Sequence, residues 1–193
     1  MTTPDTVQGA TRIRLVREAE LPLLREIERA SGEIFRDIGM AEIAEDEPLS
    51  LAELGHYQRA GRAWVGTEGP ASDATDAQGG ASGTEGAPVA FLLAEPVDGH
   101  LHIAQVSVHP VAAGRRLGAA LIEHLAGLAV EQGAAGLTLT TYRDVPWNAP
   151  YYRRLGFTEI PEARLNPGLR AIRELERTAG LDRWPRLAMF RPR

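Results

Sequence analysis

Residues 108–121, VHPVAAGRRLGAAL, constrain the fold more than any other segment of this sequence. They join an apolar, strand-like run to an apolar, helix-like run through a turn that contains Gly114, Arg115 and Arg116. The first amides of a helix have no acceptor within the helix, and the helix dipole adds partial positive charge at that end. The segment therefore predicts a phosphate-binding strand–turn–helix unit, with a plain helix start that carries two solvated arginines as the alternative.

Length, composition and charge exclude several classes of protein. A chain of 193 residues with 44% hydrophobic residues suits one domain with a sizeable core. It has no cysteine, which excludes disulfides and thiolate metal sites and fits a cytoplasmic location. The net charge of -5 disfavours nucleic acid as a partner. We expect no membrane partner, because no apolar run approaches the roughly 18 residues of a membrane span, and the first residues carry no secretory or transit signal.

Residues 66–88 differ in composition from the rest of the chain. The segment GTEGPASDATDAQGGASGTEGAP contains no large apolar side chain, so it cannot offset the entropy of becoming ordered. Because strand-like runs flank it, we interpret it as a long flexible hairpin loop rather than a linker between domains. The expected organisation is a disordered tail at 1–10 followed by one domain at 11–193.

Periodicity and turn residues predict a mixed α/β domain with a single sheet. Strands are expected at residues 11–16, 64–65, 89–94, 101–108, 137–140, 157–160 and 186–190. Helices are expected at residues 22–30, 50–60, 117–132, 149–155 and 169–179. The last two strands before the phosphate-binding turn are separated by a Pro-Val-Asp-Gly turn at 96–99. The resulting order is βααβββαβαβαβ.

A second motif, WNAPYYRRLGF, occupies residues 147–157. Asn148 suits the N-cap of a short helix, and the following proline suits its first turn. Tyr151 and Tyr152 point about 100° apart around the helix axis, so one can pack while the other faces elsewhere. A phenol, with an ordinary pKa near 10, can donate a proton to a leaving thiolate, whose ordinary pKa is near 8.5. Packing with a hydrogen-bonded hydroxyl is the alternative role for either tyrosine.

The two motifs in this order resemble the GNAT family of acetyl-CoA-dependent N-acetyltransferases. VSVHPVAAGRRLGAALI is similar to the CoA-binding motif of that family, and NAPYYRRLGF is similar to its second signature. The resemblance covers about residues 11–192, and residues 106–157 carry most of its specificity. It implies one GNAT-like domain with a twisted, mostly antiparallel sheet of about seven strands, splayed at the CoA site and flanked by helices.

The resemblance also implies roles for individual residues, with acetyl-CoA as co-substrate and no metal. Main-chain groups of the strand bind pantetheine, the turn holds the pyrophosphate, and the asparagine lies beside pantetheine. Tyr152 would protonate the departing CoA thiolate, and Tyr151 is expected to pack. The implied CoA-binding residues are Val106, Ser107, Val108, Ala113, Gly114, Arg115, Arg116, Leu117, Gly118, Ala119, Asn148 and Tyr152.

Two positions depart from the family pattern. The pattern has Gln or Arg at Ala113 and Gly at Arg116, so the backbone should carry most of the diphosphate binding. Many members also carry a Glu on the strand before the turn, where this chain has no carboxylate in residues 101–106. The general base is then His102, a water chain, or Glu33 or Asp37 from the region after the first helix.

The sequence leaves the acceptor open. We expect a primary amine of a small molecule, attacked directly without a covalent enzyme intermediate; the alternatives are a protein or peptide amine, or a non-catalytic acyl-CoA-binding module. Acidic residues after the first helix, among them Glu33 and Asp37, favour a cationic substrate, with a solvated acidic face as the alternative. Arg143 is expected at the mouth of the cleft, where it would also contact the substrate. The sequence leaves the oligomeric state open, with a homodimer as one alternative.

Overall fold

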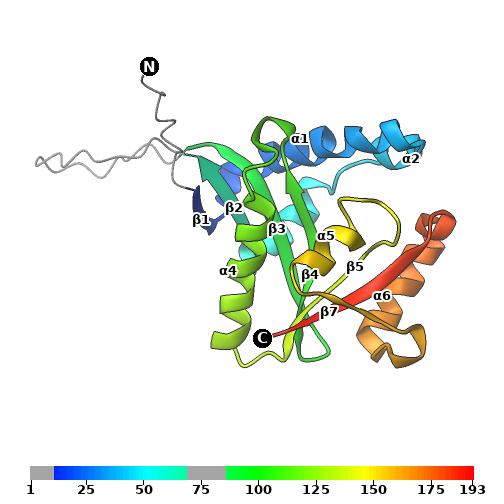
Figure 1. Cartoon of the computed structure of the whole chain (residues 1–193). Helices are drawn as coiled ribbons and strands as arrows, with labels where there is room; N and C mark the ends of the chain where they lie inside the picture. The colour runs from blue at the N-terminus through cyan, green and yellow to red at the C-terminus, as the bar shows by residue number, and fades with distance from the viewer. Residues whose placement is uncertain (1–10, 69–85) are drawn as a thin grey trace, which may run out of the picture. The chain divides into compact units, whose positions relative to one another are not determined.

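The computed structural model describes residues 11–68 and 86–193 (Figure 1). Its strands are β1 (Thr11–Leu15), β2 (Ala63–Glu68), β3 (Pro88–Val97), β4 (His100–Val108), β5 (Gly136–Tyr142), β6 (Thr158–Ile160) and β7 (Arg186–Pro192). Its α-helices are α1 (Leu21–Gly32), α2 (Ala41–Ala44), α3 (Leu51–Arg59), α4 (Leu117–Glu131), α5 (Ala149–Arg154) and α6 (Pro167–Thr178). Within these residues the seven strands form one sheet in the order β1-β2-β3-β4-β5-β7-β6.

The predicted class and the order of the main elements are confirmed. The sheet is mostly antiparallel, and β4 and β5 form a parallel pair. The short helix α2 was not predicted, because four residues are too few for a periodic pattern to emerge. The expected loop at 66–88 lies largely outside the described residues, as does the expected tail at 1–10. The boundaries expected for the loop were wrong, since β2 continues through Glu68 and β3 begins at Pro88.

The chain divides into two compact units. One comprises residues 1–91 and 107–121, and the other comprises residues 92–106 and 122–193.

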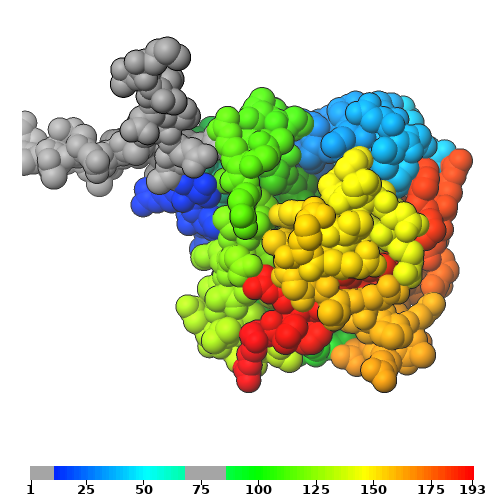
Figure 2. Space-filling model, viewed as in Figure 1, coloured from blue at the N-terminus to red at the C-terminus, as the bar shows by residue number. Residues whose placement is uncertain are grey.

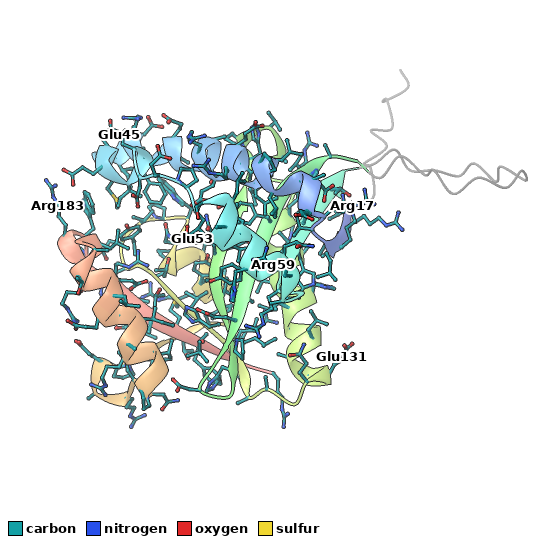
Figure 3. All side chains as sticks on the ribbon, turned by 180° about the vertical axis from the view of Figure 1, so that it is seen from behind. Arg17, Glu45, Glu53, Arg59, Glu131 and Arg183 are labelled. Atoms are coloured by element: carbon teal, nitrogen blue, oxygen red, sulfur yellow. The ribbon has the colours of Figure 1, made fainter. Side chains whose placement is uncertain are left out.

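In the first unit, β1 pairs antiparallel with β2 along its whole length, from Thr11 opposite Glu68 to Leu15 opposite Trp64. Helix α1 buries a stripe of Leu21, Leu24 and Ile27 at helical spacing. Helix α3 begins with a capping box, in which the Ser50 hydroxyl accepts from the Glu53 amide and the Glu53 carboxylate accepts from the Ser50 amide. Figure 3 labels Glu53 and Arg59 in the first and last turns of this helix.

In the second unit, β5 pairs with β7 along its whole length, and β7 also pairs with the short β6. Figure 1 shows β7, in red, running beside β5. Helix α6 lies between β6 and β7 in the sequence. Its Leu169 packs with Leu165 and with Ala188 of β7 in a buried apolar cluster. This packing fixes α6 against the strand that follows it.

The turn between β3 and β4 caps the start of α6. Asp98 and Gly99 both adopt left-handed backbone conformations, with φ of 49° and 78°, as a two-residue hairpin turn requires. The Asp98 carboxylate accepts hydrogen bonds from the amides of Gly168 at 2.9 Å and Leu169 at 3.1 Å. Asn166, at the N-cap position of α6, makes no side-chain cap. The negative charge at the helix N-terminus therefore comes from a turn about 70 residues earlier in the chain.

Gly168 is required by this close approach. A Cβ at Gly168 would lie 2.7 Å from Cγ1 of Val97 and 2.8 Å from Oδ2 of Asp98, whereas a Cβ at Gly127 of α4 would meet nothing within 4 Å. We expect Gly168→Ala to lower the free energy of unfolding by about 1–3 kcal/mol, because the capping turn must move. The matched control, Gly127→Ala, should raise it by about 0.5–1 kcal/mol. Urea denaturation measures both, and equal stabilities would contradict the prediction.

Candidate functional site

The predicted phosphate-binding turn lies in the first unit, between the end of β4 and the start of α4. After Val108, the His109 amide bonds to the Val89 carbonyl at 2.8 Å, and the ring Nδ1 of His109 accepts from the Val111 amide at 3.2 Å. These contacts fix the start of the turn. Residues 113–116 are exposed, and α4 begins at Leu117.

Two residues of this turn are left-handed. Gly114 has φ of 78°, and Arg116 has φ of 61°. The GNAT pattern has glycine at the Arg116 position, and the backbone conformation explains the preference, since this conformation costs a residue with a side chain about 1–2 kcal/mol. The Arg116 carbonyl accepts from the Ala120 amide at 3.0 Å, so the first helical amides are those of Leu117 and the two residues after it. These amides have no acceptor within the helix and can hold a phosphate.

In the second unit, the ladder between β4 and β5 ends early. It runs from Leu101 opposite Leu137 to Ile103 opposite Leu139, although β5 continues to Tyr142. The portion of β4 that belongs to this unit continues to Val106, three residues past the last β4–β5 pair, Ile103 opposite Leu139. Where two parallel strands separate, their main-chain N–H and C=O groups no longer pair with each other. An extended ligand that contains amides can then bond to these groups as an added strand would. The expected splay corresponds to the end of this ladder.

Asn148 was expected to cap α5, and this expectation was wrong. It occupies the N-cap position, but its side chain makes no cap hydrogen bond. Instead, Nδ2 donates to Oγ1 of Thr141 at 2.7 Å. The remaining Oδ1 is buried and has no hydrogen-bond partner. An unsatisfied buried acceptor costs about 1–3 kcal/mol, so this oxygen fits the N–H of a ligand amide such as those of pantetheine.

Tyr152 is the buried tyrosine of α5. Its ring contacts Tyr151 and Phe157 edge to face, with centroids 5.5 Å and 5.7 Å apart. Burial raises the pKa of Tyr152 above its ordinary range; Tyr151 acts in the same direction, and the positive charge of Arg186 acts against it. The phenol is therefore protonated at neutral pH. We expected Tyr151 to be the packed residue, but it is only half-buried, with Arg154 over its ring.

The segment that carries Asn148 and Tyr152 is visible in Figure 2. Residues 145–160 form a continuous yellow-to-orange region of the surface, bordered by red residues of the C-terminal strand. Asn148 and Tyr152 come from this segment, and the hydroxyl of Thr141 orients the asparagine from β5.

His102 lies in β4 directly opposite Thr138 of β5, and its side chain is 2% exposed. Nδ1 of the ring is 3.1 Å from the Thr138 hydroxyl oxygen. Burial lowers the pKa of His102 to about 4, and the negative charge of Glu176 acts in the opposite direction. The imidazole is therefore neutral at neutral pH. A neutral ring can accept a proton, although burial makes it a weak base.

The expected substrate-contacting residues are divided between the units. Glu33 and Asp37 lie in a 3-10 helix, Glu33–Ile38, of the first unit, where Glu33 is paired with Arg36 at 2.9 Å. Arg36 also pairs with Glu45, labelled in Figure 3. Arg143 lies in the second unit and makes a two-pronged pair with Glu159, at 2.9 and 3.0 Å. Of these candidates, Asp37 is exposed and has no side-chain ion pair among those found in the described part of the chain.

Sequence reasoning missed the polar residues that hold these groups in place. Thr138 and Thr140 were recognised only as residues of the expected strand at 137–140, and neither Thr141 nor Glu176 was singled out. The alternation indicated which threonines share a face, but no local signal showed which helix covers that face.

Residues 11–68 and 86–193 contain neither a candidate metal site nor a candidate membrane span. No group of three or more histidine, aspartate or glutamate side chains there is placed to hold a metal ion. None of the helices in those residues is both long enough and apolar enough to cross a membrane.

Three solved structures share the fold. The ribosomal-protein-S18-alanine N-acetyltransferase from Escherichia coli superposes with a TM-score of 0.58 at 19% identity, over 95% of this chain and 94% of that one. N-acetylglutamate synthase from Neisseria gonorrhoeae, complexed with coenzyme A and N-acetyl-glutamate, gives 0.65 at 14% identity, over 96% of this chain and 35% of that one. PaiA N-acetyltransferase from Thermoplasma acidophilum, in complex with coenzyme A, gives 0.56 at 14% identity, over 95% and 99%.

The sequence itself matches a family model. The matching model describes the acetyltransferase (GNAT) family and covers residues 38–157. This stretch is more than half of the chain and includes both motifs. The protein therefore belongs to the GNAT family of acetyltransferases.

Proposed function

We propose that this acetyltransferase uses acetyl-CoA and transfers the acetyl group to a primary amine of a small molecule by direct attack. The observation that carries the proposal is the buried, unpaired Oδ1 of Asn148, which suits an amide N–H of pantetheine. The solved relatives with bound coenzyme A support the same co-substrate.

The turn before α4 is proposed to hold the pyrophosphate through its backbone. The amides of Leu117, Gly118 and Ala119 are directed outward at a helix N-terminus, and Arg115 adds positive charge nearby. Val106, Ser107 and Val108 are proposed to bond the pantetheine arm through main-chain groups, past the end of the β4–β5 ladder. The remaining turn residues, Ala113, Gly114 and Arg116, are proposed to line the path of the diphosphate with their backbone.

Tyr152 and His102 are proposed to move the protons. The amine nitrogen forms a bond to the acetyl carbon, the carbon–sulfur bond breaks, and the electron pair leaves on sulfur. Tyr152 gives its phenolic proton to that sulfur, and burial keeps the phenol protonated until then. His102 takes the proton lost by the amine, directly or through water, because it is neutral at the working pH. Glu33 and Asp37 are the alternative acceptors of this proton.

A protein or peptide amine is the second candidate acceptor. The solved relatives include an N-acetyltransferase of a ribosomal protein and a synthase of N-acetylglutamate, so both classes of acceptor share this fold. In the first unit, exposed acidic residues near α2 favour an acceptor with positive charge.

Thiol release from acetyl-CoA tests the function directly. The panel contains polyamines, aromatic amines, amino acids, aminoglycosides and peptides, with products identified by mass spectrometry. All 21 lysine-or-arginine positions of this sequence are arginine, so acetylation of the enzyme's own lysines cannot contribute background. We expect turnover with a small amine. Turnover with peptides alone would assign a protein substrate, and CoA binding without turnover would contradict the catalytic proposal.

Tyr152→Phe removes the proposed acid without changing the shape of the ring. We expect kcat to fall by about 10² or more, while the Kd for CoA is unchanged, because only proton donation is lost. Tyr151→Phe is the matched control and should leave kcat within a factor of about 2, since that hydroxyl has no assigned role in the reaction. A Tyr152→Phe enzyme with normal kcat would remove Tyr152 from the mechanism.

Substitutions of Arg116 separate backbone conformation from side-chain charge. Arg116→Gly should keep the free energy of unfolding or raise it by up to about 1 kcal/mol, because glycine adopts a left-handed φ without strain. Arg116→Val should lower it by about 1–2 kcal/mol, since β-branched residues are poorly tolerated there. Calorimetric titration should find CoA affinity retained in Arg116→Gly. A large loss of affinity would mean that the side chain, rather than the backbone, holds the diphosphate.

A further inference from the structure

Helix α6 carries a buried carboxylate to the sheet face on which His102 lies. Side chains two residues apart in a strand share a face, so Thr138 and Thr140 of β5 lie on one side of the sheet. The hydroxyl of Thr138 is in hydrogen-bond contact with Nδ1 of His102, and the hydroxyl of Thr140 donates to Glu176. A line of polar groups thus crosses from β4 to β5 to α6 within the second unit.

Two arginines hold Glu176 in place. Arg186 of β7 contacts both carboxylate oxygens, at 2.7 and 3.2 Å, and stacks on the ring of Tyr142 with 4.5 Å from its Cζ to the ring centroid. Arg173 of α6 bonds to the same carboxylate and to Asp182 at 2.6 Å. The side chains of Glu176, Arg173 and Arg186 are 13%, 9% and 10% exposed. The carboxylate is therefore fixed, largely buried and shielded from solvent.

The charges around Glu176 keep it ionised. Burial alone would raise the pKa of Glu176, but the hydrogen bonds and charge of Arg186, with further bonds from Thr140 and Arg173, lower it overall. The groups that act on His102 are the hydroxyl of Thr138 and this negative charge. The carboxylate therefore opposes the effect of burial on the imidazole.

We propose that Glu176 is a positioning residue for catalysis, supplying from α6 the negative charge that β4 lacks and stabilising the imidazolium formed when His102 takes the acceptor's proton. This inference rests on the proposed function, in which His102 is the base. No bond between Glu176 and the substrate is required. Its charge acts across Thr138 and Thr140, and its place is fixed by the arginine pair.

Glu176→Gln tests the charge while keeping the size of the side chain and an oxygen that can accept hydrogen bonds. We expect kcat to fall about 10-fold with KM for acetyl-CoA unchanged, because a weaker base slows proton transfer and not binding. Asp182→Asn is the matched control: it removes the other carboxylate partner of Arg173 and has no contact with Thr140. Its kcat should stay within about 2-fold of the native value. Equal losses in both variants would overturn the proposal.

A second readout does not depend on turnover. The ring protons of His102, followed by NMR at pH 4.5, should show a protonated fraction at least halved in Glu176→Gln and unchanged in Asp182→Asn. An unchanged fraction in Glu176→Gln overturns the proposal. If that variant does not fold, Glu176→Asp decides, since it keeps the negative charge while drawing it back toward α6. It should lower the protonated fraction measurably, and no change overturns the proposal.

Failure of the proposed base is distinguishable from failure of this inference. Normal turnover in His102→Gln would remove His102 from the mechanism, whatever Glu176 does. The NMR comparison tests the link between Glu176 and His102 by itself.

Discussion

The early end of the parallel pairing between β4 and β5 is the constraint on which the second unit depends. Three pairs hold the strands together, and β5 then continues beside β7 alone. Because β7 still bonds to the main-chain groups along one edge of β5, β5 remains ordered beyond the point where its pairing with β4 ends. The two faces of β5 then contact different groups. Thr141 orients Asn148 on one side, and Thr138 and Thr140 contact His102 and Glu176 on the other.

Local sequence signals predicted the elements well where periodicity was long. The stripe of α1, the alternation of β5 and the Asp-Gly turn at residues 98–99 each follow from rules that act over a few residues. Contacts between distant segments could not be predicted in this way. Asp98 looked like a turn residue, and nothing near it in the sequence indicates that it caps α6. Asn148 looked like a cap, because its true partner, Thr141, lies in the preceding strand.

The part of the candidate site that consists of main-chain groups could be predicted from the sequence. The turn at 113–116 was recognised from glycine spacing, and Arg116, which stands where the family pattern has glycine, has the left-handed φ that glycine favours. The side-chain chemistry was less predictable. His102 was chosen because β4 has no carboxylate, but its burial, its contact with Thr138 and the resulting weak basicity depend on which strand lies opposite. Periodicity alone does not give that neighbour.

The buried charged cluster around α6 is not explained by its contribution to the free energy of unfolding alone. It buries Arg173, Arg186 and Glu176 beside Asp182, and well-packed apolar residues of similar volume stabilise a protein as much or more than such clusters do. The adjacent contact of Leu169 with Leu165 and Ala188 already attaches α6 to β7 without any charge. What apolar packing cannot provide is a fixed negative charge that acts on a buried imidazole. The proposed effect of Glu176 on His102 would therefore account for the cost of burying these ions, which the attachment of the helix does not require.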